Sequence, residues 1–438
     1  MTNRLLVSKS SLLQYFALYV LVMMNSSRLW SIIQHRDEAI SYIIKISIII
    51  IWVLISISSD GKLRDRRNIF FVLFLTITVI FVRFVNGGAG LDVLSEWASY
   101  IFIVDICIKL NKEQFLNRFI NTVYVLAGIS IICFTVQIIA PDILKSLFSQ
   151  YDSNFQSYAG WGVNGATYIT QQAWGKYLFT FDERNVTRNM GVFSEPGCYQ
   201  IVLNSAIFVL LFLREYIDFE PKQYNKRLFV MCIALVTSQS TTGYIGLCLL
   251  LLFYATNKDT DAIQTKKIVL CIVITALVVL LGDYVLNRNN SIIGSVIISK
   301  VFGSGKSIDL TKSTGIYRVQ TIIAAMDIML KHPFGVGFSE ANAMVTTLFS
   351  ESAGAVLILT GAALGVIPFL GFIIWTLKPV ACSTALCNKV KVLYILLWIN
   401  TTLAQSEELY TGLIFVPMYC AAVLYPQLKR YDGGRGSE

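Results

Sequence analysis

The chain has 438 residues, of which 55% are hydrophobic and only 14% are charged, and its mean hydropathy is +0.62. This composition excludes an ordinary soluble globular protein and is typical of a chain that crosses a membrane many times. The net charge of +9 comes mostly from basic connections between apolar segments, so it indicates membrane topology and not nucleic-acid binding.

Apolar runs close to the thickness of a bilayer recur along the whole sequence. They predict an all-α polytopic membrane protein with about twelve transmembrane helices, in which residues 1–438 form a single integral membrane domain. The expected helices cover residues 11–27, 40–58, 69–85, 91–108, 120–140, 197–213, 227–238, 241–256, 267–285, 353–377, 390–404 and 410–426. The seventh and eighth are short and are joined by the polar run 238–243, so they could also be one broken helix.

Lysine and arginine residues gather in alternate connections and are scarce in the short connections between them. By the positive-inside rule, both termini and the basic connections are cytoplasmic. The long loops 141–196 and 287–352 then lie outside the cytoplasm. The first apolar run follows Arg4 and Lys9 like a signal peptide, but no cleavage site of small residues comes after it, so it is expected to remain as the first span.

Charged residues within the predicted helices are few. Lys45, near the outer end of the second helix, is expected either to pair with Glu96 or to extend to the membrane surface. Asp105 is expected to reach water at the cytoplasmic end of its helix. The nine cysteines show no disulfide or zinc spacing and are expected to be apolar packing residues.

The most informative stretch is Arg188-Asn-Met-Gly-Val-Phe-Ser-Glu-Pro-Gly197, where the first long loop meets an apolar helix. A helix start exposes N–H groups that favour an anion, and a guanidinium presents donors that match phosphate oxygens. Arg188 is therefore a candidate phosphate ligand, although it could instead cap a helix or pair within its loop. Glu195 could accept a proton from an attacking hydroxyl, or it could favour the helix dipole or pair with Arg188.

The second long loop contains a helical pattern from Ile316 to Leu330, which suits an amphipathic helix on the membrane surface or against the bundle. Its apolar face comprises Val319, Ile322, Ile323, Met326 and Leu330. Arg318 opens this helix and His332 follows it, so an unbroken helix places the two roughly 20 Å apart, too far to bind one phosphate together. His332 could act as a base near neutral pH, or it could be a turn residue hydrogen-bonded to backbone.

These motifs, in this order and on one side of the membrane, resemble the Wzy-type O-antigen and capsule repeat-unit polymerases, whose superfamily also contains the O-antigen ligases. The resemblance rests on Arg188-x-x-Gly191-x-Phe193-x-Glu195-Pro196-Gly197, on Ser238-x-Ser240-x-x-Gly243, and on Arg318 followed by His332-Pro333-x-Gly335-x-Gly337. It covers most of residues 180–370 and the overall topology, while the first five helices add hydropathy alone.

The resemblance implies a GT-C-like membrane glycosyltransferase that inverts the anomeric centre and uses no metal or other cofactor. The donor would be a growing glycan on undecaprenyl diphosphate, and the acceptor a single repeat unit on a second such lipid. Transfer would occur at the periplasmic face of a bacterial inner membrane, with 141–196 and 287–352 as periplasmic loops. Expected partners are these lipid-linked glycans, the lipid bilayer, a chain-length regulator and a flippase, but no nucleic acid.

Carried over to this chain, the resemblance implies that Arg188 and Arg318 bind two separate lipid diphosphates. The candidate catalytic residues are Arg188, Arg318, Glu195 and His332. The residues expected to contact substrate are Arg83, Gly191, Gly197, Tyr317, Gly335 and Gly337.

Two other functions remain as alternatives. An O-antigen ligase would use the same donor and transfer the glycan to a lipid A core; that branch usually carries a histidine before the helix after the second loop, where this chain reads Phe349-Ser-Glu-Ser352. Glu351 could replace that histidine as a base. A flippase or other transporter for lipid-linked oligosaccharides is the second alternative, but the chain shows no inverted repeat, and its polar residues concentrate at the outer face.

Overall fold

The computed structural model describes residues 9–24, 27–36, 38–58, 66–86, 91–111, 114–149, 173–175, 177–182, 186–256, 314–349, 357–383 and 386–403. They form the helices α1 (Lys9–Met24), α2 (Arg28–Arg36), α3 (Glu38–Ser58), α4 (Arg66–Asn86), α5 (Leu91–Asn111), α6 (Phe115–Ile139), α7 (Pro141–Ser149), α8 (Pro196–Phe212), η4 (Arg214–Tyr216), α9 (Pro221–Thr237), α10 (Thr241–Thr256), α13 (Thr314–Lys331), α14 (Phe338–Phe349), α15 (Ile358–Leu364), α16 (Val366–Ala381) and α17 (Asn388–Thr402). Within these ranges the only sheet is the antiparallel pair β1 (Ala173–Trp174) and β2 (Phe181–Asp182). The prediction of an all-α protein is confirmed at this level.

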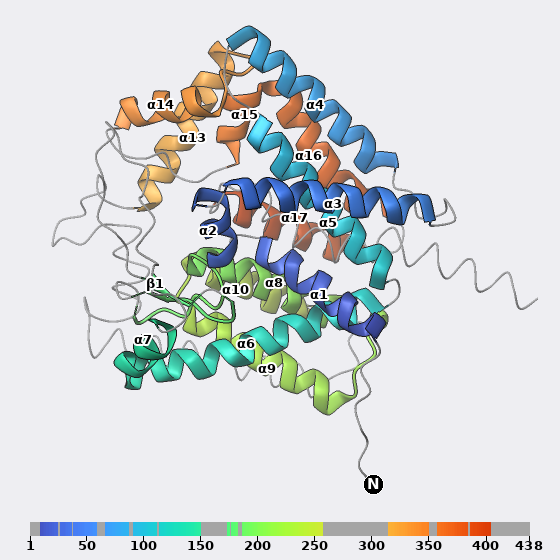
Figure 1. Cartoon of the computed structure of the whole chain (residues 1–438), viewed down its shortest axis with the longest axis vertical. Helices are drawn as coiled ribbons and strands as arrows, with labels where there is room; N and C mark the ends of the chain where they lie inside the picture. Colours follow the sequence, from blue (N-terminus) through green and yellow to red (C-terminus); the bar gives the residue numbers. More distant parts are fainter. Residues whose placement is uncertain are drawn as a thin grey trace, which may run out of the picture.

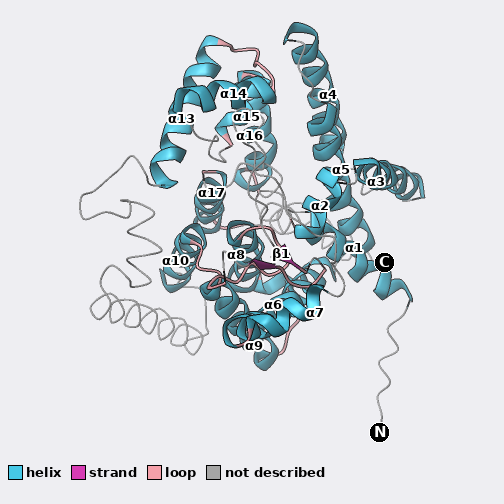
Figure 2. Cartoon of the chain, turned by 60° about the vertical axis from the view of Figure 1, so that its left-hand side comes forward, coloured by secondary structure: helices cyan, strands magenta, loops and turns pink. Residues whose placement is uncertain are grey.

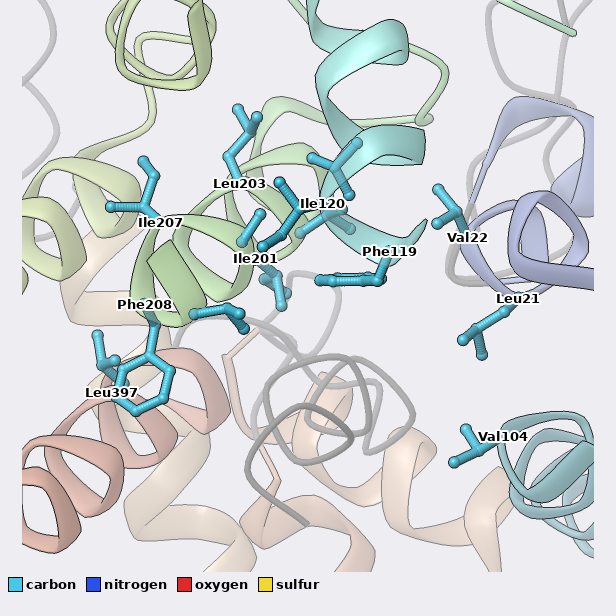
Figure 3. Packing of buried hydrophobic residues seen from close by; sticks show 14 of the residues in the cluster. Leu21, Val22, Val104, Phe119, Ile120, Ile201, Leu203, Ile207, Phe208 and Leu397 are labelled. Carbon is cyan, nitrogen blue, oxygen red and sulfur yellow. The ribbon is translucent and has the colours of Figure 1, made fainter. Parts of the chain in front are cut away.

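Helix α8 lies at the centre of the largest bundle. It is apolar around most of its circumference, and its residues are almost all buried against α6, α9 and α10. Helices α1, α3 and α5 form a neighbouring group that reaches α8 through α6, while α16 and α17 connect α4 to α10. Figure 3 shows aliphatic and aromatic side chains from several of these helices converging, among them Phe119, Ile120, Ile201, Phe208 and Leu397.

A smaller core joins α13, α14 and α15. It contains Ala324, Ala325, Ile328, Val336, Ala341, Val345, Leu359, Ala362 and Ala363. Figure 1 and Figure 2 both show these three helices at one end of the molecule, with α6, α8, α9 and α10 at the opposite end. The small alanine side chains allow the short helices to approach closely, so this group forms a compact cap beside α4 and α16.

The outward faces of several helices are apolar. On α3 the exposed residues Ile43, Ile46, Ile50 and Leu54 follow one another at intervals of three and four, and α4 shows the same pattern in Phe70, Leu73, Ile77, Ile80 and Phe84. In a soluble protein the apolar stripe of a helix faces the core and the polar stripe faces water. Here both the inside and the outside of the bundle are apolar.

One helix among the described residues, α6, is both long and apolar enough to cross a membrane by length and composition. Six shorter apolar helices lie at Ser11–Met24, Ala39–Ile55, Ile69–Val85, Pro196–Phe212, Thr241–Ala255 and Val366–Ala381. The predicted number of about twelve spans is therefore not confirmed. The helices expected at 267–285 and 410–426 fall outside the described residues, as does the part of the loop 287–352 that precedes α13.

Two helix boundaries clarify the sequence prediction. The short seventh and eighth segments are two separate helices, α9 and α10, because Gln239 between them adopts a left-handed backbone conformation with φ of 48°. The helix expected at 353–377 is instead α15 followed by α16, which is a correction to the prediction. The break lies at Gly365, whose φ is 96°.

A backbone clasp explains this break. The segment 333–337 lies against residues 362–366, where Val336 N donates to Ala362 O, Gly337 N to Ala363 O, and Val366 N to Pro333 O. A Cβ atom added at Gly335 would lie 2.4 Å from Ala363 O, and one at Gly365 would lie 2.6 Å from Pro333 O. Only glycine at both positions permits the two backbones to approach so closely.

Asp105 does not reach water, contrary to the prediction. Its side chain is buried and forms an ion pair with Lys109 at 2.8 Å, while Trp52 Nε1 donates a hydrogen bond to it at 2.5 Å. The Lys109 ammonium also lies 5.2 Å from the centroid of the Trp52 ring. The carboxylate stays inside the bundle because α3 and α5 supply both a cation and a donor.

Candidate functional site

Arg188 lies between the first long loop and the hairpin that joins α9 to α10. Its Nη2 donates a hydrogen bond to the backbone oxygen of Gln239 at 3.2 Å, while its Nε is buried without a hydrogen-bond partner in the described structure. Burial lowers the pKa of the Arg188 guanidinium from its ordinary value, and the nearby side chains of Glu195 and Tyr244 oppose that shift. The guanidinium is thus held in place with donor capacity left over.

A hydrogen-bond network inside the bundle fixes the backbone next to Arg188. The fully buried Asn189 side chain donates to Ser130 Oγ at 3.2 Å and to Thr237 Oγ1 at 3.0 Å, and it accepts a bond from Gly191 N at 3.0 Å. Ser130 Oγ lies 2.7 Å from the hydroxyl of Tyr199, the fourth helical residue of α8. Helices α6, α8 and α9 therefore position the arginine together.

Gly191 is buried in a turn with φ of 57°, directly on the ring of Tyr199. A Cβ atom there would lie 2.9 Å from Tyr199 Cζ, so only glycine fits. Its carbonyl accepts a hydrogen bond from Thr180 N at 2.7 Å, which ties the turn to the segment before β2. Gly191, predicted to contact substrate, has a packing role in this structure.

Glu195 occupies the N-cap position of α8. Its backbone is extended, its side chain makes no capping hydrogen bond, and Pro196 begins the helix. The carboxylate is exposed, and within the described structure it interacts with Arg188 through charge without a direct ion pair. Gly197 is buried in the first turn of the same helix. Arg188, Glu195 and the start of α8 therefore lie around one position.

The hairpin 238–243 is anchored by α8 and α17. Asn400 Nδ2 of α17 donates to Thr242 O at 3.0 Å, and Asn204 Nδ2 of α8 donates to Gly243 O at 3.3 Å. Gly243 lies against Gln200, where an added Cβ atom would be 2.8 Å from Gln200 Cβ. These contacts hold the Gln239 carbonyl where Arg188 binds it.

The second predicted motif lies in the cap of α13–α15. Helix α13 is unbroken from Thr314 to Lys331, so Arg318 near its start and His332 after its end are about 21 Å apart along the axis. His332 is exposed, and its backbone N–H continues the helical pattern by donating to Ile328 O. The side chains of Tyr317 and Arg318 fall outside what the structure describes.

The apolar face predicted for this helix is present, but most of it faces outward. Val319, Ile323, Met326 and Leu330 are exposed, whereas Ile322 packs against the cap core. Gly335 and Gly337, two of the residues expected to bind substrate, are buried in the backbone clasp. Arg83 is exposed near the end of α4, two residues beyond Phe81, whose ring meets Phe334 edge-on at 6.0 Å.

Several residues that complete the site could hardly be predicted from the sequence. Gln239 contributes a backbone oxygen, which any residue carries, and its contact with Arg188 depends on how α9 packs beside α6 and α8. Asn189 lies in the quoted motif, but its partners Ser130 and Thr237 are far away in the chain. Their polarity inside apolar helices was the one available signal.

Metal ligands do not cluster among the described residues: no group of three or more His, Cys, Asp or Glu side chains there could hold a metal ion. No family model, curated protein or solved structure matches this chain.

Proposed function

We propose that the chain is a polytopic bacterial inner-membrane glycosyltransferase that polymerises lipid-diphosphate-linked repeat units into O-antigen or capsular polysaccharide at the periplasmic face. The observation that supports it most is the position of Arg188. This cation is fixed by a buried network, retains an unpartnered Nε, and lies beside the carboxylate of Glu195 at the start of α8. A diphosphate leaving group needs such a fixed donor, because negative charge develops on it as the glycosidic bond breaks.

The apolar outer surface supports a membrane location. Exposed stripes of large apolar residues on α3 and α4 would cost free energy in water, whereas lipid chains accept them. The short apolar helices fit the proposed set of about twelve spans, of which α6 alone meets the length criterion within the described residues. A tilted or interrupted span also satisfies its backbone groups when neighbouring helices surround it.

Contacts between distant segments support the proposed division of the helix ends between two faces. Positions assigned to the outer face meet one another: Gln137 Nε2 donates to Val186 O, Asn400 Nδ2 to Thr242 O, and Phe81 meets Phe334. Positions assigned to the cytoplasmic face also meet one another: Gln14 Nε2 donates to Leu110 O, Asp218 N to Asn117 Oδ1, and Arg227 to Asn121 Oδ1. The charge bias of the sequence and the packing thus favour the same two faces.

In the proposed reaction, a hydroxyl oxygen of the acceptor sugar attacks the anomeric carbon of the donor glycan. The bond from that carbon to the lipid diphosphate breaks, and the diphosphate leaves with the electron pair, stabilised by Arg188. Glu195 takes the proton of the attacking hydroxyl, for which its exposure at the helix start leaves it accessible. Arg318, which is far along α13 from His332, binds the diphosphate of the second lipid.

The test is the size profile of surface glycan from cells that carry Arg188→Ala, beside wild type, a deletion strain and the matched variant Arg214→Ala. Arg214 is an exposed arginine at the opposite end of α8, on the proposed cytoplasmic face. We expect single-repeat products with Arg188→Ala and a normal ladder with Arg214→Ala, at equal expression. A normal ladder with Arg188→Ala would remove Arg188 from the mechanism, and loss of even single units from the surface would favour a ligase or a flippase.

A further inference from the structure

Lys45 is a buried cation on the face of α3 that packs against α5. Its side chain is only 6% exposed, Nζ donates to Ser95 Oγ at 3.4 Å, and the ammonium lies 5.6 Å from the centroid of the Tyr42 ring. An ammonium has three N–H donors, and the bond to Ser95 is the one that the described residues provide for it. The side chain of Glu96, its expected partner, lies outside what the structure describes, and no carboxylate of the described side chains forms an ion pair with Lys45. Among the described side chains the ammonium of Lys45 thus has no counter-charge, and a buried charge is unfavourable without one, so this position suits an anion.

Ser41 adds a second unmatched group at the same place. It lies one helical turn before Lys45 on the same face of α3, where residues four apart are neighbours. Its side chain is 2% exposed, and its hydroxyl has no hydrogen-bond partner within the described structure. Native proteins seldom leave such a group unsatisfied, and it adds a second donor on the same face of α3 as Lys45. An acceptor with several oxygens on one centre fits this arrangement.

The depth of these residues indicates where the anion comes from. Lys45 lies about 10 Å along the axis from the start of α3, and Ser95 about 6 Å from the start of α5. If both helices begin at the outer face, as the proposed function has it, this is the level at which headgroups meet acyl chains. The anions that a membrane supplies at this level are the phosphate groups of its lipids, and basic sites between helices are known to bind them.

We propose that Ser41, Lys45 and Ser95 form a lipid-phosphate site between α3 and α5, in addition to the diphosphate sites at Arg188 and Arg318. The membrane depth of this site rests on the proposed function, whereas its chemistry rests on the buried ammonium and the unmatched hydroxyl. The phosphate belongs either to a polyprenyl diphosphate or to an anionic phospholipid. Both present the same oxygens to Lys45, and the test separates them.

The test measures binding by native mass spectrometry of the full chain purified in neutral detergent. Two probes are titrated separately, undecaprenyl diphosphate and phosphatidylglycerol, against wild type, Lys45→Met, Lys45→Arg and Ser41→Ala. Lys226→Met, which changes an exposed lysine on α9, is the matched control. For at least one lipid we expect Lys45→Met to weaken binding by about tenfold to a hundredfold, since it removes a charge-assisted hydrogen bond. Lys45→Arg should retain binding, and Ser41→Ala should weaken the same lipid.

The lipid that responds to Lys45→Met identifies the source of the phosphate. Equal binding of both lipids to wild type and Lys45→Met would overturn the proposal. A thermal-unfolding scan in lipid-free detergent supplies a second criterion, because a buried ammonium awaiting an anion destabilises the empty protein. Lys45→Met should therefore raise the unfolding temperature. The opposite result would be a lower unfolding temperature for Lys45→Met and for Glu96→Gln, restored in the double variant. It would show that Glu96 neutralises Lys45, and it would also overturn the proposal.

Neither readout needs turnover. Loss of lipid binding in Lys45→Met from a protein that makes no polysaccharide would leave this site standing and would remove the proposed function. Unchanged lipid binding by Lys45→Met, in a protein whose glycan ladder depends on Arg188, would remove this site and leave the proposed function standing.

Discussion

Gly191 shows how strongly a single position shapes the Arg188 loop. We expect Gly191→Ala to destabilise the protein by about 1–3 kcal/mol, because its φ of 57° disfavours a side chain and the new Cβ would lie 2.9 Å from the Tyr199 ring. Thermal unfolding of the purified protein measures this. Displacement of Tyr199 would also disturb its contact with Ser130 and, through Asn189, the position of Arg188.

Gly128→Ala is the control for this change. Gly128 lies within α6, and a Cβ atom there would meet nothing within 4 Å, so alanine should be neutral or stabilise the helix by up to about 1 kcal/mol. Equal unfolding temperatures for the two variants would show that the Gly191 turn relaxes without cost.

Helices α3 and α5 owe their pairing partly to a buried charge cluster. We expect Asp105→Asn to destabilise the protein by about 3–5 kcal/mol, because it leaves the Lys109 ammonium buried without its counter-charge. Asp327→Asn tests the same i,i+4 geometry at an exposed pair with Lys331, where the change should stay below about 1 kcal/mol. Chemical or thermal unfolding in detergent compares the two, and similar small effects would mean that water reaches the Asp105 pair.

Helix positions could be predicted where the apolar run itself decides them, as in α6 and α8. The break at Gly365 could not, because a glycine within an apolar run breaks the helix here only through the backbone of residues 333–337. The burial of Asp105 could not be predicted for a related reason, since Trp52 and Lys109 surround its carboxylate only when α3 and α5 pack. In the site, the residue type of Arg188 was informative, but its contact with Gln239 joins two loops that are distant in sequence.

At the scale of the whole molecule, the two polar ends of the bundle should differ in their access to reagents. In a background whose cysteines are replaced by serine or alanine, Thr187→Cys should react with a membrane-impermeant maleimide added to spheroplasts. Lys222→Cys should react only after permeabilisation, because the basic end of α9 is expected in the cytoplasm. Both residues are exposed, so burial does not account for a difference. Labelling of Lys222→Cys in sealed spheroplasts would show that the orientation is the reverse of the proposed one.

The clasp between residues 333–337 and 362–366 has a consequence for how this surface can diversify. Its hydrogen bonds join main-chain atoms alone, so its shape depends on glycine at positions 335 and 365 and hardly on the other side chains. The exposed His332 beside it can therefore be exchanged without loss of the local structure. Variants of this chain could therefore keep the same rigid corner and present different side chains from it.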